Sequence, residues 1–530
     1  MCVSFISSSN FLQICSLTLH AKILSVRQSV KNHLWLIGFV VALLPLLLMR
    51  DFTPANELRY LSIADEALRN HAFFAFTNHG VPYADKPPLY LWLVMLLRSV
   101  FGGHYMLVLS ALSMVPAVLI MSVMNDWGKQ EMDAGTRLTT NMMLLTSGIF
   151  IGAAIMVRMD MLMALFIVLA LRSFWRMYVD ENAGKAERWR FPLYVFLALF
   201  TKGALGLLIP LFATVVFLVI SHKSQCVWRY WGWRMWSVLI GCCALWWCMA
   251  YVEGGYSYVY DLLFHQTIGR TFHSFHHAHS FYYYFICIWY NLAPWSLLVL
   301  CSLVSAFRKK EVKSDLHKFF LTVSVTTMVL LSCISGKLQV YMLPAVPFMV
   351  YATGLYLPRI MQRWWFRPSL VVPACIFTLA LPVLVLAECV GSVASFALPK
   401  MAHLAAYVSA TILTISGVYA VCHVRKSVRS LSIGMMAAAF VAIPIIPVIN
   451  HYSGYASVCA SARRMSQEAD GLPIVTWKMK NAEDMDVYLG QVPGLIPDDA
   501  TPDKYLTTSA VVIERDKSKG GWKVVLIKKE

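Results

Sequence analysis

Charged residues are scarce in this sequence: Asp, Glu, Lys and Arg make up only 14% of its 530 residues, whereas 58% are hydrophobic. A mean hydropathy of +0.61 excludes a single soluble domain of ordinary proportions. Nucleotide-binding motifs of the GxxxxGK(S/T) or GxGxxG kind are also missing. The chain is therefore expected to work in a membrane and without a cytosolic nucleotide.

Cysteine pairs with zinc-like spacing are absent too. The 13 cysteines form no CxxC pair, and most lie in apolar runs, where a free cysteine behaves as a small buried hydrophobe. Residues 1–31 contain no convincing signal-peptide cleavage site, and we expect them to be a cytoplasmic segment. The apolar run from His33 to Met49 follows and is long enough to remain as a signal anchor.

The net charge of +17 would suggest a nucleic-acid partner in a soluble protein. Here the Lys and Arg residues cluster in short stretches between apolar runs, as the positive-inside rule predicts for cytoplasmic loops. The charge therefore reports membrane topology, and the expected partners are membrane lipids, with no nucleic acid.

Apolar runs long enough to cross a bilayer as helices set the expected fold class. We predict an all-α polytopic membrane protein with about 13 transmembrane helices, starting near Leu34, Tyr105, Leu138, Asp160, Phe191, Ala204, Met235, Phe281, Phe319, Leu338, Leu370, Met401 and Leu431. The shorter apolar run from Pro88 to Phe101 carries Arg98, and we predict that it is a helix lying in the outer interface. Counting it as a span would place later basic clusters on the wrong side.

This topology divides the chain into three parts. After residues 1–31 comes a membrane domain over 32–450, with long outer loops at 50–103 and 251–280. Residues 451–530 form an outer-face tail in which apolar and polar residues alternate over Pro473–Trp477 and Ala510–Glu514. Alternation of this kind predicts strands, so the tail is expected to be a small soluble α/β domain.

Conspicuous charges lie at the ends of spans on the predicted outer face. They are Glu57, Lys86, Arg158, Asp160, Lys202, Arg270 and Lys337. Charges at span ends are functional candidates, and cations that converge at one face suit an anionic phosphate headgroup. The alternative for each cation is an anchor that reaches the interface along its aliphatic stem.

The two carboxylates of this set, Glu57 and Asp160, could act as general base or stabilise charge at a sugar carbon. The alternative for both is a salt bridge to Arg59 or Arg158. Histidines crowd the second outer loop, and His265 and His276 together with Asp85 could bind a divalent metal. The alternative for these histidines is hydrogen bonding to substrate or lipid headgroups.

Several short motifs surround these charges. They are Asn56-Glu57-Leu58-Arg59-Tyr60, which begins an amphipathic pattern running to Leu68, then Tyr83-Ala84-Asp85-Lys86-Pro87-Pro88-Leu89-Tyr90, Arg158-Met159-Asp160, Thr201-Lys202-Gly203, Arg270 with Phe272, and Lys337-Leu338 with Tyr341. In combination they resemble the membrane glycosyltransferases of the GT-C class, in particular the family of aminoarabinose lipid A transferases and protein O-mannosyltransferases. The resemblance spans about Leu34 to Pro347.

The resemblance implies an inverting transferase that uses a polyprenyl-phosphate sugar, such as an undecaprenyl-phosphate donor, and requires no cofactor. It places the site at the periplasmic face of a bacterial inner membrane, with a glycolipid such as lipid A, a glycan or a protein as acceptor. By position, the donor phosphate would be held by Lys86, Arg270, Tyr83 and Tyr341. The sugar and acceptor site would contain Glu57 and Asp160, with Asn56, Arg59, Arg158, Lys202 and Lys337 as further candidates.

One residue departs from the family pattern. The acidic pair of the family begins here with Asn56, and an amide cannot accept a proton from the acceptor. An acceptor that is already anionic, such as a lipid A phosphate, would need no strong base, whereas a hydroxyl would require Glu57 or Asp160.

Other functions remain open at this point. A protein O-mannosyltransferase-like enzyme would share the donor chemistry, and so would a ligase or polymerase of surface polysaccharide. A transporter of lipid-linked sugars would more typically carry charges within its spans and paired repeats, which this sequence does not show.

Overall fold

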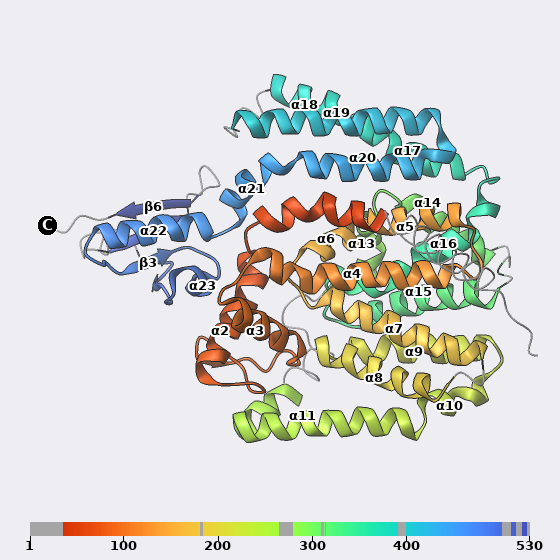
Figure 1. Ribbon diagram of the computed structural model, residues 1–530, viewed down its shortest axis with the longest axis horizontal. Coiled ribbons are helices and arrows are strands. Elements are labelled where there is room, and N and C mark those ends of the chain that lie inside the picture. Colours follow the sequence, from red (N-terminus) through yellow and green to blue (C-terminus); the bar gives the residue numbers. More distant parts are fainter. Residues whose placement is uncertain are drawn as a thin grey trace, which may run out of the picture.

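The computed structural model describes residues 35–180, 184–263, 279–308, 312, 314–390, 399–500, 510–515 and 522–526. Most of the described chain is helical, and the long helices lie side by side (Figure 1). The helices of the first half are 35–49, α4 (Met106–Gly128), α5 (Ala134–Leu145), α6 (Gly148–Ile155), α7 (Asp160–Val179), α8 (Lys185–Lys202), α9 (Leu205–Ile220), α10 (Val227–Trp231) and α11 (Trp233–Tyr260).

The second half continues the bundle. Its helices are α13 (Tyr283–Asn291), α14 (Ser296–Arg308), α15 (Asp315–Cys333), the short η4 (Gln339–Ala345), α16 (Val346–Ile360), α17 (Phe366–Thr378), α18 (Ala380–Cys389), α19 (Lys400–Cys422), α20 (Ser427–Val441) and α21 (Ile446–Ser453). Helices α18 to α20 lie along one side of the bundle, and α11 lies along the opposite side (Figure 1).

Seven of the described helices are long and apolar enough to cross a membrane, or up to nine if each of two bent pairs counts as one span. One bent pair is α5 with α6, where the axis turns by 64° after Leu145. Several predicted spans correspond to shorter helices, such as 35–49 and α9. The count of 13 spans and the division at residues 32, 450 and 451 stay predictions.

The core of the bundle is built from aromatic and aliphatic side chains between α4, α7, α9, α15 and α16. Trp127 is buried at its centre and meets Phe320 edge to face, with ring centroids 5.0 Å apart. Phe319 packs against Phe217 at 4.9 Å and stacks with Trp175. Packed ring contacts of this kind hold α4, α7, α9 and α15 against one another.

Two predicted helices of the first outer segment are confirmed. Helix α2 (Arg59–Asn70) is amphipathic and buries its apolar face, and α3 (Leu89–Phe101) begins directly after Pro88. Strands β1 (Thr77–Asn78) and β2 (Val81–Pro82) form an antiparallel hairpin between them. Helices α2 and α3 lie together at one end of the bundle (Figure 1). Their placement in a membrane interface stays a prediction.

The C-terminal part projects from the same end of the bundle (Figure 1). Its sheet has the order β4-β3-β5-β6, formed by β3 (Ile474–Trp477), β4 (Gly494–Ile496), β5 (Val511–Arg515) and β6 (Trp522–Leu526). Strand β3 pairs in parallel with β4 and β5, and β6 is antiparallel to β5. Helices α22 (Ala456–Glu468) and α23 (Asp486–Leu489) accompany the sheet. The strands expected from alternation are therefore present.

Candidate active site

The centre of the site is a buried carboxylate between two cations. Asp160 is 1% exposed and begins α7, where the positive end of the helix dipole favours an acidic residue. Its Oδ2 lies 3.1 Å from Nε of Arg158, and its Oδ1 pairs with the ammonium of Lys202. These three span-end charges therefore lie together, and the salt bridge to Arg158 considered as the alternative for Asp160 is present. A catalytic role for Asp160 stays a prediction.

Local sequence explains how Lys202 reaches this position. It is the last residue of α8, and Gly203 follows with φ of 101°, a conformation that residues with a side chain rarely adopt. The helix therefore ends at the lysine, and the chain turns directly into α9. The Lys202 ammonium also lies over the ring of Tyr341, 4.5 Å from its centroid.

The segment that carries Lys86 lies beside this cluster. Its ammonium is 3.2 Å from the carboxylate of Asp85, which also accepts a hydrogen bond from the hydroxyl of Tyr83 at 3.5 Å. The positive charges of Lys86 and Lys202 are close enough to repel each other. The negative charge of Asp85 likewise lies within electrostatic range of the phenol of Tyr60. These electrostatic interactions link the first outer segment to the start of α7 and the end of α8.

Glu66 on α2 fixes the hairpin that leads into this segment. Its carboxylate accepts hydrogen bonds from the hydroxyl of Thr77 at 2.5 Å and from the backbone N–H groups of His79 and Gly80 at 2.6 and 2.9 Å. Burial raises the pKa of Glu66, but these hydrogen bonds outweigh it and hold the pKa below its ordinary value. The carboxylate therefore stays ionised and holds the hairpin that precedes Tyr83.

Two tyrosines frame the cluster. Tyr60 on α2 is buried, and burial raises its pKa, so its phenol stays neutral beside Arg158 and Asp160. Its ring meets Tyr90 edge to face at 5.8 Å. The phenol of Tyr341, in η4, lies within electrostatic range of Arg158. The rings of Tyr60 and Tyr341 thus surround the charged cluster with apolar surface, and their hydroxyl groups are the polar atoms of that surface.

Glu57 lies in a different environment from the one expected. It is fully buried, and both guanidinium nitrogens of Arg50 bind it, each at 2.7 Å. The backbone N–H groups of Thr53 and Val157 also donate to it, at 2.7 and 2.6 Å. The salt bridge considered for Glu57, to Arg59 or Arg158, is wrong: its partner is Arg50, because α2 begins after the turn that faces the end of helix 35–49.

Sequence reasoning missed Arg50. The signal available was its position at the outer end of the first apolar run, seven residues before Glu57. Arg50 also donates to the carbonyl of Ile155 at 3.0 Å. It therefore ties the first helix, the Glu57 turn and the end of α6 together, next to the Arg158–Asp160 pair.

Three other candidates lie apart from the centre of the cluster. Asn56 is exposed in the short π-helix η1 (Pro54–Leu58) that runs into α2. The positive charge of Arg59 interacts electrostatically with Tyr60 and with Asp484 of the C-terminal part, so Arg59 lies within electrostatic range of both. Lys337 is buried and donates to the carbonyl of Ile334 at 2.5 Å; among described residues it has no ion pair. Arg270, His265 and His276 lie outside the described residues.

The metal prediction is therefore left with one described member, Asp85. Within the described ranges, no group of three or more His, Cys, Asp or Glu side chains could hold a metal ion. Asp85 instead pairs with Lys86 and Tyr83. A divalent metal at this loop stays a prediction.

The charge balance indicates what the cluster can bind. Among the described residues, Lys86, Arg158 and Lys202 face the carboxylates of Asp85 and Asp160, so these five side chains carry a net charge of one positive unit in a largely buried setting. Uncompensated charge is costly away from water, and a bound anion would neutralise it. Ammonium and guanidinium groups with nearby phenols are suited to phosphate oxygens.

No protein-family model matches the chain. Among curated relatives, it is 24% identical over 317 residues to the undecaprenyl phosphate-alpha-4-amino-4-deoxy-L-arabinose arabinosyl transferase of Shewanella sediminis, covering 58% of this chain and 56% of the relative. It is 26% identical over 318 residues to the protein of the same name from Pseudomonas savastanoi pv. phaseolicola, covering 59% and 58%. The matches thus span a little over half the length of these relatives.

Solved structures match over nearly the whole chain. ArnT from Cupriavidus metallidurans bound to undecaprenyl phosphate has a TM-score of 0.71 at 17% identity, covering 92% of this chain and 94% of that one. The apo state of the same protein gives 0.70. The resemblance to aminoarabinose transferases drawn from the motifs is confirmed, and the chain has the fold of these ArnT structures.

Proposed function

We propose that the chain is an inverting glycosyltransferase that moves a sugar from a polyprenyl-phosphate donor to an acceptor at the outer face of the membrane. The observation that carries the proposal is the partly buried cluster of Lys86, Arg158 and Lys202, whose positive charges outnumber by one the carboxylates that face them among the described residues. The start of α7, the end of α8 and the Tyr83–Lys86 segment converge on it, and Tyr341 frames it. This setting suits a phosphate that must be bound tightly and then carry the leaving-group charge.

The relatives support a choice of donor and acceptor. They are named as arabinosyl transferases that use undecaprenyl phosphate-alpha-4-amino-4-deoxy-L-arabinose. We therefore propose an undecaprenyl-phosphate sugar as donor and lipid A or another envelope glycolipid as acceptor. The enzyme would act in the inner membrane of a bacterium, with its site on the periplasmic face.

Lys86 and Lys202 would neutralise the phosphate oxygens, together with Arg270, which the resemblance assigns to the donor phosphate. The acceptor oxygen would attack the anomeric carbon from the face opposite the phosphate. The bond from that carbon to the phosphate oxygen then breaks, and the released polyprenyl phosphate keeps the electron pair. Electrostatic stabilisation of this phosphate would be the main contribution of the protein.

The two carboxylates favour an acceptor that is already ionised. Asp160 is held between two cations, and every oxygen of Glu57 accepts charge-assisted or backbone hydrogen bonds. The oxygens of both carboxylates are therefore already engaged by protein donors, and neither is aimed at a proton of the acceptor, as a general base must be. A phosphate of lipid A would need no deprotonation, which also accounts for an amide at exposed Asn56.

Transfer should be tested with purified protein in proteoliposomes that contain the undecaprenyl-phosphate aminoarabinose donor and lipid A. We expect the wild type to add one sugar and Lys86→Ala to add none, while Lys400→Ala, which removes an exposed lysine at the start of α19, retains activity. An active Lys86→Ala enzyme would overturn the phosphate assignment. Unchanged transfer to dephosphorylated lipid A would overturn the anionic acceptor.

A further inference from the structure

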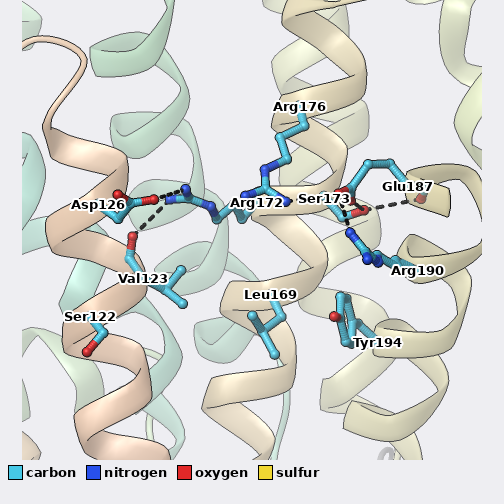
Figure 2. A pocket seen from close by; sticks show the side chains of 10 residues that line it. All are labelled: Ser122, Val123, Asp126, Leu169, Arg172, Ser173, Arg176, Glu187, Arg190 and Tyr194. Carbon is cyan, nitrogen blue, oxygen red and sulfur yellow. Dashed lines mark hydrogen bonds and ion pairs between the residues drawn. The ribbon is translucent and has the colours of Figure 1, made fainter. Parts of the chain in front are cut away.

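A second charged site lies at the opposite end of the helices from Asp160. It is a cavity of about 260 Å³ between α4, α7 and α8 (Figure 2). Its lining residues are Ser122, Val123, Asp126, Leu169, Arg172, Ser173, Arg176, Glu187, Arg190 and Tyr194. Arg172 follows Asp160 by 12 positions in α7, which is roughly 18 Å along a helix. The two sites are therefore separate.

Guanidinium groups outnumber carboxylates in this cavity. Arg176 and Arg190 both bind the same oxygen of Glu187, each at 2.9 Å, although each guanidinium offers five N–H donors. Arg172 binds Asp126 at 2.5 Å and the carbonyl of Val123 at 2.9 Å. Three arginines thus face two carboxylates, and the side chains of Arg176 and Arg190 are about half exposed. Because these two guanidinium groups are half exposed, a ligand can reach their N–H donors.

The cavity is polar on one side and apolar on the other. Figure 2 shows the arginines and carboxylates on one level, with Leu169 and Tyr194 on the level nearer the middle of the bundle. The apolar surface continues outside the cavity along α4, where Val115 and Leu119 are 52% and 45% exposed. Helical spacing places both on the same face as Ser122.

Helix α8 supplies the matching wall. Trp189 and Leu193 are 50% and 46% exposed and lie one turn apart, next to the lining residues Arg190 and Tyr194. A tryptophan beside arginines at a helix end is typical of a membrane interface. The cavity holds roughly nine waters' volume at about 30 Å³ each, which is enough for a phosphate with a few attached atoms but not for a whole lipid.

From this arrangement we infer that the cavity binds the phosphate of an anionic phospholipid, whose acyl chains lie along the exposed apolar residues of α4 and α8. The basic loops of this end make it the cytoplasmic one in the predicted topology, where anionic headgroups attract Lys and Arg. Arg176 and Arg190 hold the phosphate by bidentate hydrogen bonds, and Glu187 orients both when the site is empty. This inference does not depend on the transferase function.

The test uses the full chain in phosphatidylcholine nanodiscs doped with phosphatidylglycerol, with bound lipids counted by native mass spectrometry. We expect saturable retention of phosphatidylglycerol over phosphatidylcholine. Arg176→Gln with Arg190→Gln should weaken that preference by about tenfold or more, since hydrogen bonds to charged groups are lost. Arg188→Gln is the matched control, because it removes an exposed arginine of α8 that does not line the cavity.

A third variant separates binding from folding. Glu187→Gln removes the competing anion and should strengthen phosphatidylglycerol binding, whereas general damage to the helices would weaken it. Equal losses in Arg188→Gln and in the double variant would overturn the inference, because surface charge alone would then account for binding. Inorganic phosphate that displaces phosphatidylglycerol at low millimolar concentration would overturn the lipid assignment in favour of a soluble phosphate. Weaker binding in Glu187→Gln would also count against it.

Discussion

Glu57 offers a sharp test, because its geometry argues for a positioning role and its motif suggests a catalytic one. Replacing Glu57 with Gln keeps the shape but removes the charge that faces Arg50. Both oxygens of the wild-type side chain accept hydrogen bonds, so either orientation of the new amide points its NH₂ group at donors. The Arg50 side chain is only 10% exposed and would be left without its partner.

Breaking a buried ion pair by removing one partner typically costs about 3 to 5 kcal/mol. We expect Glu57→Gln and Arg50→Gln each to lower the free energy of unfolding by about this amount. The double variant should cost less than the two single changes together, with a coupling energy of up to about 3 kcal/mol. Unfolding in mixed detergent micelles, followed by helical circular dichroism, measures all three.

The reasoning would be refuted by a Glu57→Gln protein that has the same free energy of unfolding as the wild type and yet transfers no sugar. Such a protein would keep its structure and lack only a chemical group, as a catalytic carboxylate requires. A second contradiction would be strict additivity of the two single variants, because it would mean that Arg50 and Glu57 do not interact.

Three further outcomes follow from the same contacts. Lys202→Met keeps the aliphatic stem and removes the charge beside Asp160, so kcat/KM should fall by about 100-fold or more in the proteoliposome assay, and an unchanged value would contradict the site. Gly203→Ala forces a side chain into φ of 101° and should lower both activity and the unfolding temperature, which a wild-type melting curve would contradict. Burial raises the pKa of Asp484 to about 6, so the folded state binds a proton that the unfolded state releases above pH 3.8. The contribution of Asp484 to stability should therefore be lost as pH rises from about 4 to 6. This part of the pH dependence should be missing when the thermal unfolding of Asp484→Asn is compared with that of the wild type, and parallel pH profiles would contradict it.

The sequence predicted those features that depend on local pattern. The amphipathic spacing from Leu58 to Leu68 became α2, and the paired prolines before Leu89 started α3. Period-two alternation located β3 and β5. The proximity of Arg158, Asp160 and Lys202 could be predicted because all three lie at span ends on the same side of the membrane. That prediction needs only the order and direction of the spans, and no knowledge of how the helices pack.

Features that depend on long-range pairing could not be predicted in this way. Arg50 and Glu57 meet because a helix end and a turn pack together, and composition carries no sign of that contact. The contacts of the C-terminal part are similar: Asp51 accepts a hydrogen bond from the hydroxyl of Tyr488, and Ser62 donates to Asp486 at 2.8 Å. Span counting by hydropathy also overlooks bends, such as the one between α5 and α6.

The central claim is most directly tested by mass spectrometry of lipid A from cells with and without this gene. The account predicts that deletion removes one sugar-sized mass from lipid A, that the wild-type gene restores it, and that the Lys86→Ala gene does not although its protein is inserted in the membrane. Unchanged lipid A in the deletion strain, or restoration by Lys86→Ala, would contradict the account.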